Sequence, residues 1–190
     1  MEKNHFSGEL STERLQLKKF KIGDAKQFSN LLKDKEVAST TLMLPFPCTR
    51  QDAIDIIKKY QKEQKLQMTM RWAMTIKDTE TLIGGIRLVP NVSFNSAEIG
   101  FWIGKKYWEK GFTYEAASAV IRYGFDELKI NRFDAHAMTE NISSINLLHK
   151  LGFQQEGLHP QLVMKWGEYK DVLTFGLLRS NFNASHNQYS

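Results

Sequence analysis

The spacing of apolar side chains divides the chain into alternating strands and helices. Apolar and polar residues alternate over residues 10–20, which predicts a half-buried strand. Helical spacing of apolar residues predicts helices over residues 25–33, 50–64, 113–128 and 142–151. Further strands are predicted over residues 72–76, 81–89, 97–104, 132–138 and 168–178, the first two as a hairpin. This order indicates a mixed α/β fold, with an early antiparallel sheet and a late βαβ-like crossover.

Proline and glycine residues mark where these elements end or bend. Pro45 and Pro47 exclude a helix over residues 44–48, and Gly152 is a suitable cap for the helix before it. The pair Gly84-Gly85 lies inside a predicted strand, which suggests a bulge or a close backbone approach. Residues 181–190 contain no Lys, Arg, Asp or Glu, which is typical of a flexible C-terminal tail. We therefore expect one domain over residues 8–180.

Composition narrows the class of protein. The chain has 190 residues, of which 42% are hydrophobic, enough to bury a good core. With 26 Lys+Arg and 21 Asp+Glu, the net charge of +5 slightly favours anionic ligands. No Arg-rich arm or basic–aromatic stripe accompanies it, so we expect no nucleic-acid partner.

The same inventory argues against a membrane, a secreted form and a metal site. No apolar run approaches the roughly 20 residues of a spanning helix, and the N-terminus shows no signal peptide. Cys48 is the only cysteine, which excludes an intrachain disulfide and a cysteine-based metal cage. We therefore expect a cytoplasmic protein without a metal, in which Cys48 is a packing residue rather than a nucleophile.

A candidate phosphate-binding turn lies in residues 97–116. A predicted strand ends there, a loop with Lys105, Lys106 and Lys110 follows, and a helix begins just after Gly111. Helix N-termini present unpaired N–H groups, and a glycine lets the backbone approach a phosphate closely. The turn therefore predicts a pyrophosphate cradle, although an ordinary strand-to-helix turn capped by Thr113 would explain the same residues. The chain has no GxGxxG and no GxxxxGK[ST] motif, so neither a dinucleotide-binding fold nor a P-loop is supported.

Five short motifs occur in a fixed order along the chain. They are TERL at residues 12–15, EIGFWI at 98–103, YW at 107–108 through EA at 115–116, N-x-x-S at 141–144, and KLGF-x-x-EG at 150–157. Together they resemble the GNAT superfamily of acyl-CoA-dependent N-acetyltransferases, and most closely its ribosomal-protein N-terminal (alanine/serine) acetyltransferase branch. The resemblance implies an α/β (α+β) fold of about seven mostly antiparallel strands and about four helices, with splayed strands forming the acyl-CoA cleft.

The resemblance also assigns a set of residues to acetyl-CoA, in a gap between residues 97–104 and 132–138. The pantetheine arm would pair with the backbone of Phe101, Trp102 and Ile103. The diphosphate would bind backbone N–H groups of Trp108, Glu109, Lys110, Gly111, Phe112 and Thr113. Asn141 would bind the pantetheine arm, and Asn146 and Lys150 would line the nucleotide end. The N-cap of a helix is the other interpretation of Asn141.

The chain departs from the family pattern in this turn. The pattern Gln/Arg-x-x-Gly-x-Gly/Ala reads Trp108-Glu109-Lys110-Gly111-Phe112-Thr113 here, and only Gly111 matches. Members of the branch often have glycine where Glu109 stands. A carboxylate beside a diphosphate is unfavourable unless it points into water, so this position bears on affinity for the cofactor.

The resemblance implies direct attack of an amine on the thioester, which needs a base. His136 is the first candidate, because it lies on the strand before Asn141 and histidine suits proton transfer at neutral pH. Glu98 is the second and would act through water. The other interpretations are a histidine packed beneath a helix and a carboxylate at a sheet edge.

The reaction also needs hydrogen-bond donors for the oxyanion and an acid for the leaving thiolate. Backbone N–H groups near Trp102 or Ile103 would stabilise the oxyanion. Many family members place a tyrosine acid seven residues after the asparagine, where this chain has Leu148. In the closer branch a serine takes that role, here Ser144, unless it is simply a serine in the first turn of a helix. A CoA thiol has a pKa of ~8.5, so water is the alternative acid.

The class of acceptor can be argued from the pKa of its amine. An α-amino group with a pKa near ~8 is neutral in about one molecule in ten at pH 7, whereas a lysine-like amine near ~10.4 is neutral in about one in two thousand. The difference, about 3 kcal/mol, favours a protein N-terminus as acceptor. A small amine (polyamine, amino acid or antibiotic) is the alternative. A non-catalytic acyl-CoA-binding or interaction protein is also open, and a homodimer rests on family analogy alone.

Overall fold

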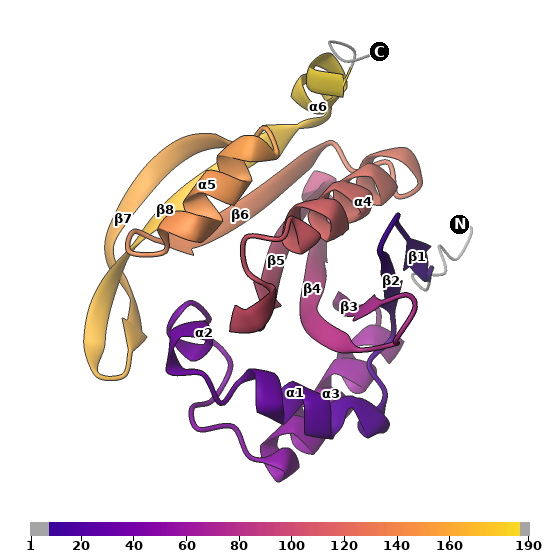
Figure 1. Cartoon of the computed structure of the whole chain (residues 1–190). Coiled ribbons are helices and arrows are strands. Elements are labelled where there is room, and N and C mark those ends of the chain that lie inside the picture. The colour runs from indigo at the N-terminus through magenta and orange to yellow at the C-terminus, as the bar shows by residue number, and fades with distance from the viewer. Residues whose placement is uncertain (1–7, 187–190) are drawn as a thin grey trace. The chain divides into compact units, whose positions relative to one another are not determined.

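The computed structural model describes residues 8–186 (Figure 1). These residues form two compact units. The first unit contains residues 8–89 and Phe101–Val120, and the second contains Pro90–Gly100 and residues 121–186. Strands β4 (Leu82–Asn91) and β5 (Ser96–Ile103), and helix α4 (Phe112–Asp126), each contribute residues to both units. The expected single domain over residues 8–180 stays a prediction.

The strands form a mostly antiparallel arrangement. In addition to β4 and β5, the described residues contain β1 (Leu10–Ser11), β2 (Leu15–Lys18), β3 (Met70–Ile76), β6 (Arg132–Met138), β7 (Gln154–Lys165) and β8 (Glu168–Leu178). Hydrogen bonds order them β1-β2-β3-β4-β5-β6-β8-β7. The pair β5–β6 is parallel, and β1–β2, β2–β3, β3–β4, β6–β8 and β7–β8 are antiparallel. The predicted mixed α/β class is confirmed, with eight strands rather than about seven.

Six α-helices lie within residues 8–186, against about four expected. They are α1 (Ala25–Leu31), α2 (Lys35–Ser39), α3 (Arg50–Lys65), α4, α5 (Ile142–Lys150) and α6 (Arg179–His186). The four predicted helices are present to within a few residues, and α2 and α6 are additional. Helix α6 includes residues 181–186 of the expected tail, whereas residues 187–190 lie outside the described residues. The flexibility of that segment stays a prediction.

The strand predicted over residues 10–20 is interrupted by a turn. The Thr12 hydroxyl accepts a hydrogen bond from the Leu15 N–H at 3.0 Å, and the Thr12 N–H donates to the Leu15 carbonyl at 2.9 Å. These bonds fold β1 back onto β2, with Leu10 opposite Leu17. Alternation alone could not show this, because the side-chain pattern continues on both sides of the turn. As a result, Arg14 lies in a turn rather than in a strand.

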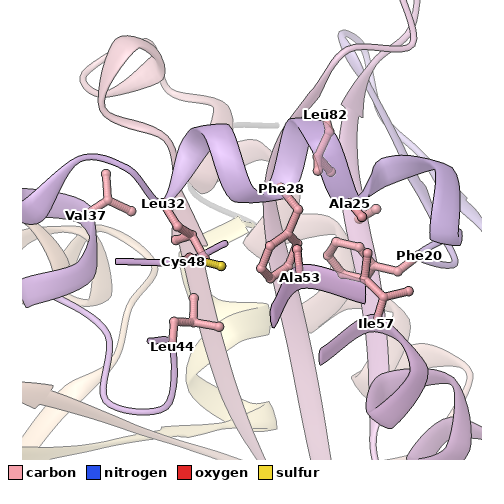
Figure 2. Close-up of a cluster of buried hydrophobic side chains, with 11 residues drawn as sticks. Phe20, Ala25, Phe28, Leu32, Val37, Leu44, Cys48, Ala53, Ile57 and Leu82 are labelled. Atoms are coloured by element: carbon pink, nitrogen blue, oxygen red, sulfur yellow. The ribbon is translucent and has the colours of Figure 1, made fainter. Parts of the chain in front are cut away.

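The core of the first unit joins α1, α3 and the residues between them (Figure 2). Its buried side chains are Phe20, Ala25, Phe28, Leu32, Val37, Leu44, Cys48, Ala53, Ile57, Ala73 and Leu82. Thr49 and Asp52 form a capping box at the start of α3, which fixes where that helix leaves the loop after Cys48. Because these residues bury large apolar surfaces, the core anchors the partly buried Trp102 and Trp108 that pack against it.

Gly84 and Gly85 allow β4 to approach β5 closely. A Cβ on Gly84 would lie 2.3 Å from the Trp102 carbonyl oxygen, and one on Gly85 would lie 2.7 Å from the Trp102 indole nitrogen. The β3–β4 register also shifts between Met74 and Thr75, opposite this pair. Both features suggested by the sequence, a bulge and a close approach, are therefore present. The glycines make room for Trp102, whose ring packs edge-on against Phe28 at 5.0 Å.

The second unit separates an apolar face from a polar one. Phe133 of β6 packs edge-on against Phe125 at 4.9 Å, at the end of α4, and His149 of α5 lies 5.5 Å from the ring of Phe175 on β8. Phe175 is the register partner of Ala135, so both helices cover the odd-numbered face of β6. Side chains alternate across a strand. The even-numbered residues Arg132, Asp134 and His136 therefore lie on the face opposite these helices.

We predict that Gly84→Ala destabilises the protein by about 1–3 kcal/mol or more, because the new methyl group meets backbone that cannot rotate away. Gly23→Ala is the matched control, since a Cβ there has nothing within 4 Å. Urea unfolding followed by tryptophan fluorescence measures both. Equal stability of the two variants would contradict the close approach.

Candidate functional site

The loop predicted to bind a diphosphate leads from β5 into α4, within the first unit. After a short 3-10 turn (Lys105–Tyr107), the Trp108 indole N–H donates to the Ile103 carbonyl at 3.0 Å. The Glu115 N–H donates to the Gly111 carbonyl at 3.0 Å, which makes Gly111 the residue from which the helix starts. The N–H groups of Phe112 and Thr113 consequently have no acceptor inside the helix. This is the arrangement expected of an anion-binding helix start.

Left-handed backbone shapes this loop at two positions. Gly111 has a φ of +77°, and Glu109 has a φ of +59°. The second value gives a physical reason for the glycine that the related branch often has there, because a side chain at positive φ costs about 1–2 kcal/mol. The Glu109 side chain is exposed. Its charge therefore faces water, the condition under which a carboxylate in this loop is tolerable.

The lysines of the loop are partly engaged by neighbours. Lys105 pairs with Glu36 at 2.6 Å, and this hydrogen bond raises the pKa of the Lys105 amine. Lys106 and Lys110 lie 4.9 and 6.0 Å from the centre of the Tyr107 ring. The positive charge predicted around the turn is present, with one lysine already paired to a carboxylate.

Arg14 is a residue of this loop environment that sequence reasoning used only as part of a motif. Its guanidinium donates to the Lys110 carbonyl at 3.0 Å and to Glu115 at 2.7 Å, and lies 4.4 Å from the centre of the Phe112 ring. Glu115 also accepts from the Arg14 N–H at 2.8 Å and from the Thr12 hydroxyl at 2.5 Å. We call these three residues, Thr12, Arg14 and Glu115, the Arg14 clamp.

The clamp determines the charge state of Glu115. Partial burial alone would raise the pKa of this carboxyl, but the hydrogen bonds from Thr12 and Arg14 outweigh it, and the pKa lies below its usual value. The carboxylate is therefore ionised at neutral pH and stays paired with Arg14.

The second unit places His136 beside Glu98. The parallel register sets Glu98 opposite Asp134, so Glu98 shares a face with His136 two residues further along β6. The His136 Nδ1 lies 3.7 Å from the Glu98 Oε2, and the two side chains are 41% and 35% exposed. This distance is longer than a direct hydrogen bond. His136 is thus accessible beside a carboxylate, and it does not pack beneath α4 or α5.

An ion-pair network occupies the rest of this polar face. Arg132 donates to Asp134 at 2.7 Å and to Glu156 at 2.9 Å. Gly176 lies beneath it, where a Cβ would come within 2.5 Å of the Arg132 guanidinium. The network lowers the pKa of Glu156 through the hydrogen bond from Arg132. Asp134 is consequently engaged by Arg132, whereas Glu98 faces His136.

Helix α5 holds the other predicted residues of this unit. The Asn141 Oδ1 accepts a hydrogen bond from the Ser144 N–H at 3.2 Å, so Asn141 is the N-cap, as its alternative interpretation stated. Asn146 and Lys150 are exposed further along the helix. The cap uses only the side-chain oxygen, and an asparagine amide has two donor hydrogens besides.

The remaining predicted positions lie in β5. Phe101, Trp102 and Ile103 belong to the first unit, and the Trp102 ring contributes to its core. Any role of Trp102 in pairing with a pantetheine arm would therefore be a role of its backbone. The Ile103 carbonyl already accepts from Trp108, and a carbonyl oxygen has a second lone pair for another donor.

Other kinds of site find no support in the described part of the chain. Cys48 is 4% exposed, and burial, followed by the charge of Asp52, raises its pKa to about 11. A neutral, buried thiol is a poor nucleophile. Within residues 8–186 no group of three His, Cys, Asp or Glu side chains could hold a metal ion, and no helix is long and apolar enough to cross a membrane.

A family model described as "Acetyltransferase (GNAT) domain" matches residues 14–154. The chain belongs to the GNAT acetyltransferase family. It is 35% identical over 177 residues to the uncharacterized N-acetyltransferase p20 of Bacillus licheniformis, covering 91% of this chain and 97% of that protein. Over 83 residues it is 39% identical to the [ribosomal protein uS5]-alanine N-acetyltransferase of Escherichia coli, covering 43% of each chain.

Solved structures agree with this family. A GNAT acetyltransferase from Bacillus anthracis superposes with a TM-score of 0.79 at 25% identity, covering 91% of this chain and 99% of that one. The microcin C7 self-immunity acetyltransferase MccE, in complex with acetyl-CoA and AMP, gives a TM-score of 0.79 at 15% identity, covering 87% and 93%. The latter shows the fold alone. The predicted GNAT family is confirmed, and the chain is an N-acetyltransferase. The partial similarity to the uS5-alanine N-acetyltransferase supports the predicted ribosomal-protein-like branch.

Substitutions at Asn141 distinguish the observed N-cap from the predicted contact with CoA. We predict that Asn141→Asp keeps the cap on α5 but weakens CoA binding, because aspartate retains the acceptor oxygen and lacks the amide donors. Asn141→Ala loses both and also costs about 1 kcal/mol of stability. Calorimetric titration with CoA and thermal unfolding measure the two effects. Unchanged CoA affinity in Asn141→Asp would leave Asn141 with the cap alone.

Proposed function

We propose that the protein transfers an acetyl group from acetyl-CoA to the N-terminal amine of a protein. The observation that carries the proposal is the accessible His136 beside Glu98, because an α-amine needs only a weak base. The partial similarity to the uS5-alanine N-acetyltransferase supports a protein acceptor of this type. A ribosomal-protein acceptor would place the reaction in the cytoplasm.

In this proposal the loop of the first unit holds the cofactor's diphosphate. The N–H groups of Phe112 and Thr113 at the start of α4 would donate to it, and Lys106 and Lys110 would add positive charge. Gly111 has no side chain that would keep a phosphate away from these N–H groups. Acetyl-CoA supplies the activated acetyl group, and these residues fix the end of the cofactor that does not react.

His136 would take the proton that the amine must lose. The amine nitrogen forms a bond to the thioester carbonyl carbon, and the C–S bond breaks with its electron pair leaving on sulfur. The imidazolium formed at His136 is stabilised by the negative charge of Glu98 at 3.7 Å. Asp134 is held by Arg132 and does not compete for this proton.

The leaving thiolate then takes up a proton to form CoA. Ser144 would relay it from the first turn of α5, its hydroxyl giving one proton to the sulfur while it takes another from solvent water; the Ser144 N–H is fixed by Asn141. A CoA thiolate is a moderately stable leaving group with a pKa near ~8.5. The acid consequently contributes less than the base, and its removal should cost less activity.

An acceptor panel tests the proposed function. We expect CoA release from acetyl-CoA in the presence of peptides with a free N-terminal alanine or serine. The same peptides blocked at the α-amine, with a lysine retained, should release CoA about a hundredfold more slowly, because the lysine amine is about 3 kcal/mol harder to deprotonate. Spermidine, free amino acids and aminoglycosides complete the panel. Turnover with these small amines and none with peptides would favour the small-molecule alternative instead.

Substitution of His136 tests the assignment of the base. We predict that His136→Gln lowers kcat by about 10²–10⁴-fold on an accepted peptide and changes the acidic limb of the pH profile. Glu98→Gln should reduce kcat less, because its carboxylate acts on His136 from 3.7 Å. His149→Gln is the matched control, since His149 packs on Phe175 on the opposite face. An unchanged pH profile in His136→Gln would rule out His136 as the base.

A further inference from the structure

The Arg14 clamp connects the N-terminal turn to both sides of the diphosphate loop. Arg14 and Glu115 are 101 residues apart in sequence, and the Arg14 backbone N–H and side chain both bond the same carboxylate. The Thr12 hydroxyl donates to that carboxylate as well. Glu115 lies in the first turn of α4, and its side chain is 16% exposed. The first turn of the helix is therefore fixed to the β1–β2 turn by three donors.

The same arginine also holds the loop before the helix. Its Nη1 donates to the Lys110 carbonyl, and its guanidinium lies over the Phe112 ring. A Cβ on Gly111 would lie 3.4 Å from the Arg14 Nη2, so the guanidinium passes close along the glycine backbone. Arg14 thus contacts the residues immediately before and after Gly111. One side chain therefore bonds the peptide group before the left-handed glycine and contacts the ring of the residue after it.

We propose that Arg14 and Glu115 are positioning residues for the cofactor's diphosphate. This rests on the proposed function, in which the N–H groups of Phe112 and Thr113 bind that diphosphate. Arg14 orients them by holding the Lys110 carbonyl, while Glu115 fixes the helix turn and neutralises the guanidinium. The pair acts on the phosphate end of acetyl-CoA and not on the thioester.

Two acetyl donors distinguish this role from a general loss of structure. Acetyl-CoA contains the diphosphate, whereas S-acetylpantetheine has the same thioester and arm without it. We expect Arg14→Gln to raise KM for acetyl-CoA about tenfold, as expected for lost charge-assisted hydrogen bonds, with kcat nearly unchanged. With S-acetylpantetheine, kcat/KM should be the same as in the unmodified protein. Arg14→Lys should recover only part of the affinity, because one ammonium cannot match the guanidinium's fixed donors.

Arg71→Gln provides a matched control in the same unit. Arg71 bonds Glu63 at 3.0 Å and lies 4.2 Å from the centre of the Tyr60 ring, which reproduces the ion pair and ring contact of Arg14 away from the loop. It should lower thermal stability without changing the KM ratio of the two donors. Glu115→Gln should shift that ratio in the same direction as Arg14→Gln.

The outcomes distinguish failure of the proposed function from failure of the positioning role alone. If the unmodified protein uses neither donor and does not bind CoA, the proposed function fails and the positioning role fails with it. If the unmodified protein is active but Arg14→Gln loses activity equally with both donors, the clamp is merely structural and this inference is overturned. Wild-type KM for acetyl-CoA in both Arg14→Gln and Glu115→Gln would overturn it as well.

Discussion

The contact between Arg14 and Glu115 is the constraint around which the first unit's loop is organised. A partly buried carboxylate is costly unless donors surround it, and here an arginine, a backbone N–H and a threonine hydroxyl do so. Once these bonds form, the start of α4 and the turn after β1 occupy fixed positions in relation to each other. The unusual backbone at Glu109 and Gly111 lies directly beside this contact. Strained conformations persist where neighbouring structure fixes them on both sides.

Much of the fold could be predicted from the sequence because its elements have one apolar face. Helices α1, α3, α4 and α5 and the longer strands repeat that face often enough to be recognised. Helix α2 was missed because its five residues contribute only Val37 and Ala38 to the core. The break between β1 and β2 was missed because it depends on hydrogen bonds of one threonine, which leave no trace in side-chain periodicity.

The residues of the candidate site likewise include some that the sequence indicates and some that it does not. The motifs and their spacing predicted the loop around Gly111 and gave His136 and Glu98 as two separate candidate bases, and the N-cap was the alternative interpretation of Asn141. The partners of these residues were not visible, since they come from distant parts of the chain. Nothing local to Glu115 indicates that Arg14 bonds it, and nothing near Arg132 indicates that Gly176 leaves room for its guanidinium. The pattern of a single sequence shows which side of a helix or strand is apolar. It does not show which elements face one another, and ion pairs depend on that.

The low pKa of Glu115 has a consequence for how the enzyme responds to acid. A carboxyl whose folded-state pKa lies below its unfolded value stabilises the fold above the unfolded value, and that stabilisation disappears as the pH falls through the folded one. Mild acidification near neutrality therefore leaves the bonds of Arg14 and Thr12 to this carboxylate intact. Glu115 therefore keeps the turn after β1 joined to the start of α4 across the mildly acidic range, and this join weakens only where the carboxyl itself takes up a proton.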